Sequence, residues 1–255
     1  MIRRIAVVVP AADEEEDIAE CLSALRLSRQ ELQWLRGGDV AVHVLVVLDR
    51  CRDRTPAIVA QFSEFQALTA TARCVGAARQ IGAQAALAAA GEAGGLWLAS
   101  TDADSRVPRT WLTQIVMEAR LGAEVILGTV QPEIGLPPGV DAAWCDRHHA
   151  REGHPHVHGA NLALRADAYI ALGGWNAMSS GEDVDLADRM AHRRVSRTAA
   201  MPVTTSVRRN ARAPHGFSSY LRSLGRPARQ SIGRPPVTAT RAPDTKLASS
   251  DASMT

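Results

Sequence analysis

Cysteine is scarce in this chain of 255 residues. Four cysteines are scattered along it, at Cys21, Cys51, Cys74 and Cys145, and no two of them form a C-x-x-C pair. Disulfide frameworks and cysteine-ligated metal sites need closer or more regular spacing than this. We therefore expect buried or free thiols, a reducing compartment and a cytoplasmic protein.

Long apolar runs are also missing. No stretch approaches the roughly 18 consecutive apolar residues of a transmembrane helix. The opening "MIRRIAVVVP" combines charge with a short apolar run, but a proline and a series of acids follow too early for a signal peptide. The sequence predicts neither a membrane span nor a secretory leader.

Glycine-rich phosphate loops are the third absence. Neither G-x-G-x-x-G nor G-x-x-x-x-G-K follows any strand-like segment. A dinucleotide-binding fold or a P-loop ATPase would need such a loop to bring backbone N–H groups against phosphates. If this chain binds a nucleotide, it must hold the phosphates by another device.

Strand-like and helix-like segments alternate through the first half of the chain. Strand patterns cover 2–9, 40–48, 95–100 and 123–130, and helical patterns cover 13–25, 54–65, 75–90 and 108–122. Local signals mark three helix ends: Asp13 with Glu16 as an N-terminal box, Thr55 before Pro56 as a cap, and Gly122 as a terminator. This alternation predicts an α/β fold with a parallel sheet between two layers of helices.

The rhythm changes after residue 130. Residues 131–160 are loop-rich, a shorter strand–helix–helix stretch runs to 194, and residues 225–255 are rich in Pro, Ser, Thr and Arg. We expect one domain over 1–224, made of a first half (1–130) and a loop-rich second half (131–224). A disordered basic tail is expected over 225–255.

Charge is divided unevenly along the chain. Up to Asp188 there are 16 basic and 25 acidic residues, and beyond it there are 13 basic and 2 acidic residues. A basic end of this kind could bind a polyanion, or it could be a solvated tail beside an acidic body. Composition leaves these two readings equal.

Acidic residues follow three of the predicted strands. In an open parallel sheet, ligands lie beyond the carboxyl ends of the strands. Carboxylates there could hold Mg²⁺ or Mn²⁺, which would in turn hold a diphosphate. The alternative for Asp104 or Ser105 is a simple cap of the helix after Pro108. The acids are Asp13 and Glu14, Asp49 and Asp53, and Asp102 and Asp104.

Six segments in chain order carry a family resemblance. They are "VVVPAADEEEDIAECLSAL", "VVLDRCRDRT", "ARQIGAQAAL", "STDADS", "HGANLALRADAYIALGGW" and "GEDVDLADRM". Together they resemble the family 2, GT-A-type glycosyltransferases over roughly residues 5–195. The resemblance implies the GT-A nucleotide-diphospho-sugar transferase fold, a Rossmann-like and mainly parallel sheet with helices on both faces. It also implies a nucleotide-binding half over 1–130 and an acceptor-binding half over 131–224.

The resemblance also implies roles for individual residues. The nucleotide would be bound by Pro10, Ala11, Glu14, Asp49, Arg79 and Asp102. Mg²⁺ or Mn²⁺ would be bound by Asp104 with Asp102, and His215 could complete the metal shell. The sugar and the acceptor would be bound by His158, Gly159, Ala160, Asn161 and Trp175. Asp183, with Glu182 beside it, would be the catalytic pair, and Asp183 would be the general base.

Some of these residues have structural alternatives. Glu182, Asp183 and Asp185 could only stabilise a helix end, and Trp144 and Trp175 could pack in the core and not on a sugar ring. The histidines at 148, 149, 154, 156 and 158 could be drawn as a zinc site with Cys145. Their spacing matches no zinc finger, and H-E-x-x-H is absent, so we favour an acceptor-side loop.

The sequence departs from the family pattern at three positions in its first two loops. Leu48 and Arg50 replace an acid and a glycine, and Asp13 replaces the usual Asn. The donor nucleotide is therefore open. The Gln-x-x-Arg-Trp signature of processive synthases is absent, which favours a single transfer. Attack from the face of Asp183 would invert the anomeric centre, although similar-looking retaining enzymes exist.

We therefore expect a glycosyltransferase that moves a sugar from a nucleotide-diphosphate donor to a hydroxyl of a small or lipid-like acceptor. Nucleic acid is not an expected partner. One rival is a sugar nucleotidyltransferase of the same fold, which would need a glycine-rich loop where this chain has "PAADEE". The other rival is a nucleotide-binding or polyanion-binding module without catalysis, which would use the arginine-rich end.

Overall fold

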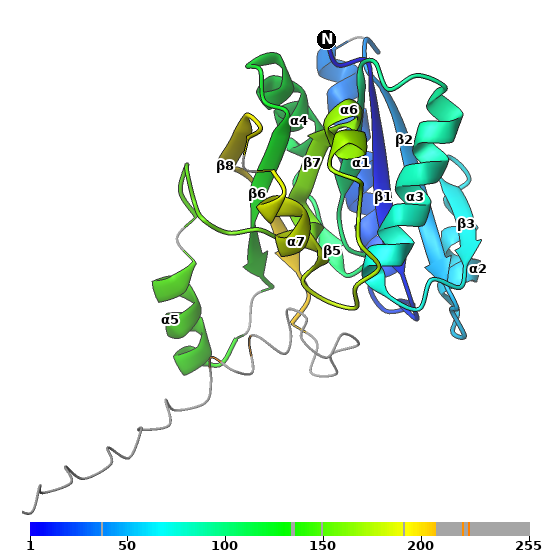
Figure 1. Ribbon diagram of the computed structural model, residues 1–255. Coiled ribbons are helices and arrows are strands. Elements are labelled where there is room, and N and C mark those ends of the chain that lie inside the picture. Colours follow the sequence, from blue (N-terminus) through cyan, green and yellow to red (C-terminus); the bar gives the residue numbers. More distant parts are fainter. Residues whose placement is uncertain are drawn as a thin grey trace, which may run out of the picture.

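The computed structural model describes residues 1–36, 38–133, 136–148, 150–190 and 192–207, together with 221 and 224. An eight-stranded sheet in the order β3-β2-β1-β4-β7-β6-β8-β5 forms its centre (Figure 1). The strands are β1 (Arg4–Ala11), β2 (Ala41–Asp49), β3 (Gln66–Ala70), β4 (Leu96–Ser100), β5 (Ser105–Arg106), β6 (Val125–Pro132), β7 (Leu162–Arg165) and β8 (Val195–Thr205).

The strands at one side of the sheet are parallel. β1 pairs in parallel with β2 and β4, and β2 pairs in parallel with β3. β7 then runs antiparallel to both β4 and β6, whereas β6 and β8 are parallel to each other and β5 is antiparallel to β8. The expected parallel order holds over the first four strands, and their carboxyl ends share one edge of the sheet.

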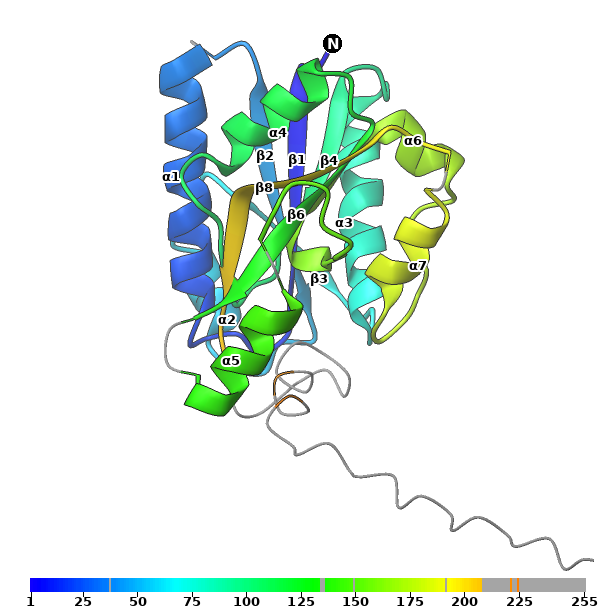
Figure 2. The same cartoon turned by 90° about the vertical axis from the view of Figure 1, so that its left-hand side faces the viewer.

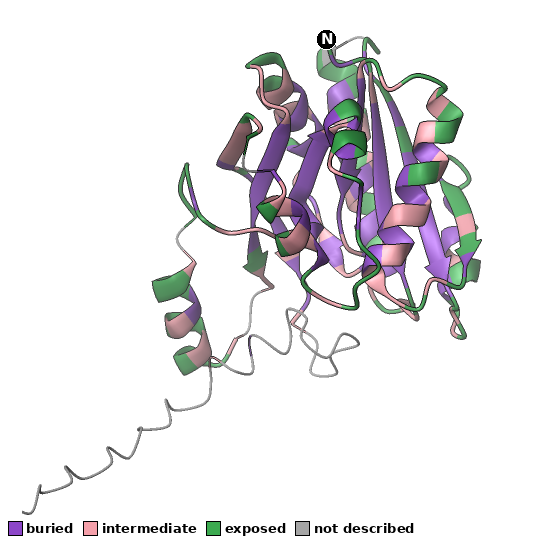
Figure 3. Cartoon of the chain, viewed as in Figure 1, coloured by how far each residue is buried: buried purple, intermediate pink, exposed green. Residues whose placement is uncertain are grey.

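Helices cover both faces of the sheet, as the sequence predicts. α1 (Ile18–Arg36) and α4 (Trp111–Arg120) lie on one face, and α3 (Val75–Ala90), α6 (Ala166–Ala171) and α7 (Glu182–Asp188) lie on the other (Figure 2). β1 serves both layers because its side chains alternate. Val7 and Val9 join one core cluster, and Ala6 and Val8 join the clusters behind them. The inner strands β1, β4, β6 and β7 are accordingly mostly buried, whereas the edge strand β3 is largely exposed (Figure 3).

Three predicted helix signals have different outcomes. Gly122 follows α4 with φ 97°, so the predicted terminator is confirmed. The Asp13 box is wrong, because α1 begins at Ile18 and Asp13 is bonded to the loop after β2. The Thr55 cap is wrong as well. Thr55 is the first residue of α2 (Thr55–Val59), and its hydroxyl accepts the N–H of Glu14.

The sequence reading also missed elements. Residues 54–65 were expected as one helix, but α2 ends at Val59 and the chain soon enters β3, which was not expected. The loop-rich stretch contains α5 (Pro138–Arg147) and the short helix η1 (Gly159–Asn161), and beyond it β8 pairs with β6 and β5. All four cysteines carry free thiols.

Some expectations fall outside this description. His215, His149 and the predicted tail over 225–255 lie beyond the residues that the structure describes. Within the described ranges, no helix combines the length and the apolar character needed to cross a membrane.

Candidate active site

Two acidic loops at the carboxyl edge of the sheet are joined to each other. Asp13 adopts φ 57°, and its Oδ1 accepts the N–H of Arg52 at 2.6 Å. In return, Asp53 accepts the N–H of Glu15 at 2.9 Å through Oδ2 and the N–H of Thr55 at 2.9 Å through Oδ1. These acids satisfy backbone groups of the loops. Of the six acids that follow the strands, Asp13 and Asp53 therefore serve the fold.

Asp49 is in a different position. It ends β2, is 7% exposed, and its Oδ1 accepts no hydrogen bond, although the Nε of Arg50 lies 3.5 Å away. Pro10 and Glu14 are half-buried nearby on the same edge. Ala11 packs its side chain into the core, so only its backbone can contact a nucleotide. A buried, incompletely satisfied carboxylate at a strand end is the feature expected of a ligand-binding group.

Arg79 is the centre of the site. It projects from α3, is 2% exposed, and forms ion pairs with Asp102 through Nη2 and with Glu182 through Nη1. Its Nε donates to the hydroxyl of Ser100 at 3.0 Å. Its guanidinium carbon lies 5.2 Å from the centre of the Trp175 ring, within the range of a cation–π contact. The sequence identified Arg79, Asp102 and Glu182 but not Ser100, which directly precedes the acidic loop.

Asp102 and Asp104 form the acidic pair after β4. Both are half-buried, and Asp102 is joined to Arg79 by its Oδ1. Burial raises the pKa of Asp102, and the neighbouring charge of Asp104 raises it further, while Arg79 opposes the shift. Two carboxylates whose charges disfavour each other fit a divalent cation, which would relieve that repulsion.

The donor set for such a cation is incomplete in the protein alone. Over the described ranges, no group of three or more His, Cys, Asp or Glu side chains is arranged to hold a metal ion. Asp102 and Asp104 could supply two carboxylates, and phosphate oxygens of a ligand and water would have to supply the rest. These residues therefore fit a metal site that is completed only when the ligand binds.

The first turn of α7 contributes the two remaining acids. Glu182 is 5% exposed and faces Arg79, and burial raises its pKa against the effect of that guanidinium. Asp183 is half-buried and accepts two backbone N–H groups, from Gly159 at 2.8 Å and from Val184 at 2.8 Å. Glu182 is thus committed to Arg79, whereas Asp183 is an oriented and partly accessible carboxylate.

Gly159 is required where α7 meets Arg79. A Cβ atom at this position would lie 2.6 Å from the Cζ, Nη1 and Nη2 atoms of Arg79. Its N–H is also the donor to Asp183. Gly159 therefore lies between Arg79 and Asp183, whereas Ala160, which follows it, is buried in the hydrophobic core.

Two residues expected to contact the sugar are used by the fold. The side chain of Asn161 is completely buried and bonds to the indole N–H of Trp111 and to the carbonyls of Thr129 and Met201, at 2.7–2.9 Å. Trp175 is 6% exposed and lies against Arg79. The expectation of a sugar contact is therefore wrong for the side chain of Asn161, which is buried and fully hydrogen-bonded. The ring of Trp175 instead packs against the guanidinium of Arg79.

The histidines form a run of stacked rings. Trp144 stacks on His148 with ring centres 3.6 Å apart, His148 on His156 at 4.7 Å, and His156 on His158 at 6.1 Å. Burial lowers the pKa of His158 to about 4, although the nearby Asp183 opposes this shift. His158 is therefore a neutral imidazole at pH 7, beside the candidate base. Among the described residues, the histidines are not grouped as ligands of a metal ion, so the structure does not support the zinc alternative.

Comparison with known proteins agrees with this geometry. The sequence model described as Glycosyl transferase family 2 matches residues 6–138, just over half of the chain. No curated protein sequence matches the chain.

Solved structures share the fold at low sequence identity. The mannosyltransferase PcManGT from Pyrobaculum calidifontis, solved with GDP-Man and Mn²⁺, is 20% identical with a TM-score of 0.61, over 86% of this chain and 60% of that one. TarS 1–349 from S. aureus, solved with UDP, is 15% identical with a TM-score of 0.56, over 81% and 61%. Glucosyl-3-phosphoglycerate synthase from Mycobacterium tuberculosis, solved with Mn²⁺, UDP and phosphoglyceric acid, is 15% identical with a TM-score of 0.53, over 87% and 74%.

The chain thus spans about three fifths of the length of the first two of these proteins. Its sheet, with helices on both faces, is that of the GT-A glycosyltransferases. On the match over residues 6–138, the chain belongs to glycosyl transferase family 2.

Proposed function

We propose that this protein transfers a sugar from a nucleotide-diphosphate donor to a hydroxyl group of a small or lipid-like acceptor. The transfer would be metal-assisted, would invert the configuration at the anomeric carbon, and would add one sugar and not a polymer. The observation that carries the proposal is the buried Arg79, which joins Asp102 on the donor side to Glu182 on α7, directly before Asp183. Elements far apart in sequence are thereby fixed around one point.

The donor would lie along the carboxyl ends of β1, β2 and β4. Pro10, Glu14, Asp49 and the backbone of Ala11 would line the base and ribose, since they lie on that edge and Asp49 has an unsatisfied carboxylate oxygen. The presence of UDP in TarS 1–349 and of GDP-Man in PcManGT supports a nucleotide-sugar donor. In this proposal residues 1–130 are the donor half and residues 131–224 the acceptor half.

Asp104 and Asp102 would hold Mg²⁺ or Mn²⁺. When bound, such a cation offsets negative charge that develops on the departing diphosphate. Arg79 would fix the orientation of Asp102, because one oxygen of that carboxylate is held by the guanidinium. The Mn²⁺ in the structures of PcManGT and of the mycobacterial synthase supports this assignment.

Asp183 would act as the general base. The acceptor oxygen forms a bond to C1 of the sugar, the bond from C1 to the diphosphate oxygen breaks, and the acceptor proton passes to Asp183. Two backbone N–H groups orient the carboxylate for this step. A base on the face opposite the leaving group gives inversion, and general-base help is typically worth about 10²–10⁴ in rate.

Two substitutions test the two ends of the site separately. Binding of UDP-, GDP- and dTDP-sugars is measured by thermal shift with and without Mn²⁺, since a bound ligand raises the melting temperature. We expect Asp104→Ala to abolish the Mn²⁺-dependent shift. We expect Asp183→Asn to keep the shift and to lower turnover by about 10²–10⁴.

Two exposed acids serve as control positions, one on α7 and one outside the site. Asp188→Asn changes an exposed acid of α7, and Asp39→Ala changes an exposed acid outside the site. Both should bind and turn over donor like the parent. Turnover by Asp183→Asn equal to that of the parent would remove the general base. If none of the sugar nucleotides raises the melting temperature of the parent, the donor assignment is wrong.

A further inference from the structure

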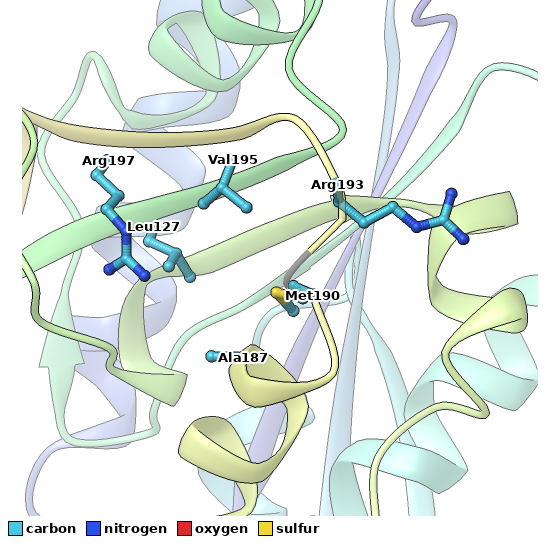
Figure 4. Close-up of a pocket in the computed structure, with 6 residues that line it drawn as sticks. All are labelled: Leu127, Ala187, Met190, Arg193, Val195 and Arg197. Atoms are coloured by element: carbon cyan, nitrogen blue, oxygen red, sulfur yellow. The ribbon is translucent and has the colours of Figure 1, made fainter.

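A pocket lies beside α7, outside the donor edge of the sheet. Its volume is about 300 Å³, and it is lined by Leu127, Ala187, Met190, Arg193, Val195 and Arg197 (Figure 4). Four of the six lining residues are apolar, and two of these, Leu127 and Met190, are almost fully buried. The residues come from β6, the end of α7, the segment that follows α7, and β8, so the pocket lies where these parts of the chain meet.

Arg197 gives the pocket a positive charge. Its Nη1 donates to the backbone oxygens of His154 at 3.3 Å and His156 at 3.4 Å, which anchors the chain that leads to His158. The Nε and Nη2 groups of Arg197 make no hydrogen bond to the part of the chain that the structure describes. Its guanidinium lies beside Leu127, whereas that of Arg193 points away from the pocket (Figure 4). The Nη1 of Arg193 instead lies 3.7 Å from the Oε1 of Glu124, with which it forms an ion pair.

The pocket is adjacent to the candidate base. Asp183, Ala187 and Met190 are spaced by four and three residues, so they lie along one side of α7 and its last turn. At about 1.5 Å of rise per residue, Ala187 is roughly 6 Å along the axis from Asp183. On the other side of the pocket, Arg197 binds the backbone of His154 and His156, shortly before Gly159, whose N–H donates to Asp183. The pocket therefore lies about one turn of α7 from the candidate base.

We propose that this pocket binds the anionic end of the acceptor, a phosphate or carboxylate on a short carbon chain that carries the reacting hydroxyl. The proposal rests on the proposed transferase function. The Nε and Nη2 groups of Arg197 can donate to two oxygens of such an anion. The apolar lining residues can contact its carbon chain. Because Ala187 lines the pocket about 6 Å along the helix axis from Asp183, we choose test compounds with a hydroxyl four or so carbons from the anion.

A binding experiment tests the site without any donor. Calorimetry measures binding of n-butyl phosphate and pentanoate, with 1-butanol as the neutral comparison. We expect the parent to bind at least one anion and not the alcohol. We expect Arg197→Gln to weaken binding at least tenfold, and Ala187→Leu, which fills the pocket and leaves Arg197 in place, to do the same.

Two control variants exclude general charge and helix effects. Arg194→Gln removes a charge of the same type from a side chain that is 70% exposed and outside the pocket. Val184→Leu enlarges an exposed side chain of α7. Both should bind the anions like the parent. Equal binding by Arg197→Gln and the parent, or equal loss in Arg194→Gln, would overturn the site.

A transfer experiment tests the link to the acceptor. With a donor that shows turnover, 4-hydroxybutyl phosphate should be glycosylated at least tenfold faster than 1,4-butanediol in kcat/KM, and Arg197→Gln should lose this preference. Equal transfer to both compounds by the parent would overturn the acceptor assignment. Anion binding that depends on Arg197, without turnover of any donor, would support the anion site and count against the transferase function.

Discussion

A single buried guanidinium carries much of the site. Arg79 is 2% exposed and has acidic partners on both sides, so neither the arginine nor its partners are isolated charges. Removing one member of such a group leaves an uncompensated buried charge, which costs about 3–5 kcal/mol. Direct replacement of Arg79 would therefore mix folding with function. A substitution at the neighbouring Gly159 can displace the guanidinium while all the charged residues are kept.

We predict that Gly159→Ala uncouples the site. The added Cβ would lie 2.6 Å from the guanidinium atoms of Arg79, so either Arg79 or the loop must shift. Displacing Arg79 separates Asp102 from Glu182 and moves the N–H that binds Asp183. We expect turnover to fall at least tenfold and the free energy of unfolding to fall by about 2–4 kcal/mol, as for other cases of overpacking and lost ion pairs.

The matched substitution is Gly139→Ala. A Cβ at Gly139 meets no atom within 4 Å, and the residue lies in α5, where alanine is favoured. It should leave turnover unchanged. Kinetics and urea unfolding of both variants check the prediction, and it fails if Gly159→Ala turns over donor as fast as Gly139→Ala.

At the level of elements, the two loops after β1 and β2 act as one unit. Asp13 binds backbone of the second loop, and Asp53 binds backbone of the first. The geometry also requires unusual backbone, since Asp13 has φ 57° and Arg50 has φ 54°. Arg50 occupies a position where the resemblance to the family expects glycine. A residue with a Cβ in this conformation costs roughly 1–2 kcal/mol, whereas glycine adopts it freely.

Arg50→Gly should therefore stabilise the protein. Relief of the backbone cost exceeds the entropy that glycine loses on folding, which leaves a gain of about 0.5–1 kcal/mol. The ion pair of Arg50 with Asp49 is half exposed and contributes little. Arg50→Ala, which loses the same side chain but keeps Cβ, should show no gain. Urea unfolding compares the two, and equal stabilities would contradict the explanation.

The same elements show what the sequence can predict. The alanine-rich α3 was predicted with its full bounds, because its pattern is local and continuous. β3 was missed because it is short and largely exposed, and β8 was missed because it lacks an alternating pattern, with Ser196, Arg197 and Thr198 in succession. Convergence of Asp49 and Asp102 was predictable, because parallel strands end at one edge. The pair between Arg79 and Glu182, 103 residues apart, has no local signal.

On the scale of the whole molecule, the stacked histidines connect α5 to the rest of the protein. α5 stands apart from the sheet (Figure 1), and Trp144 is the buried residue of this helix. Its ring begins the stack that passes through His148 and His156 to His158. Burial lowers the pKa of His148, His154 and His158, so all three are favoured as neutral rings. Acid should therefore weaken the folded state through this stack.

The pH dependence of stability follows from His158 with a definite sign. Its pKa of about 4 in the folded protein lies below the ordinary 6.5, so between these values the unfolded chain binds more protons. Stability is present above pH 6.5 and is lost as the pH falls towards 4, by up to about 3 kcal/mol from this residue. Glu182 and Asp102 act in the opposite direction, because burial raises their pKa values and their contribution falls as the pH rises.

His158→Gln separates these effects, because it removes the titrating ring and leaves both acids in place. Urea unfolding at pH 4.5, 5.5, 6.5 and 7.5 should show the parent gaining stability over this range and the variant gaining clearly less. His43→Gln, an exposed histidine on β2, serves as the control and should follow the parent. If the parent and His158→Gln lose stability equally on acidification, the acid sensitivity lies elsewhere than in the ring beside Asp183.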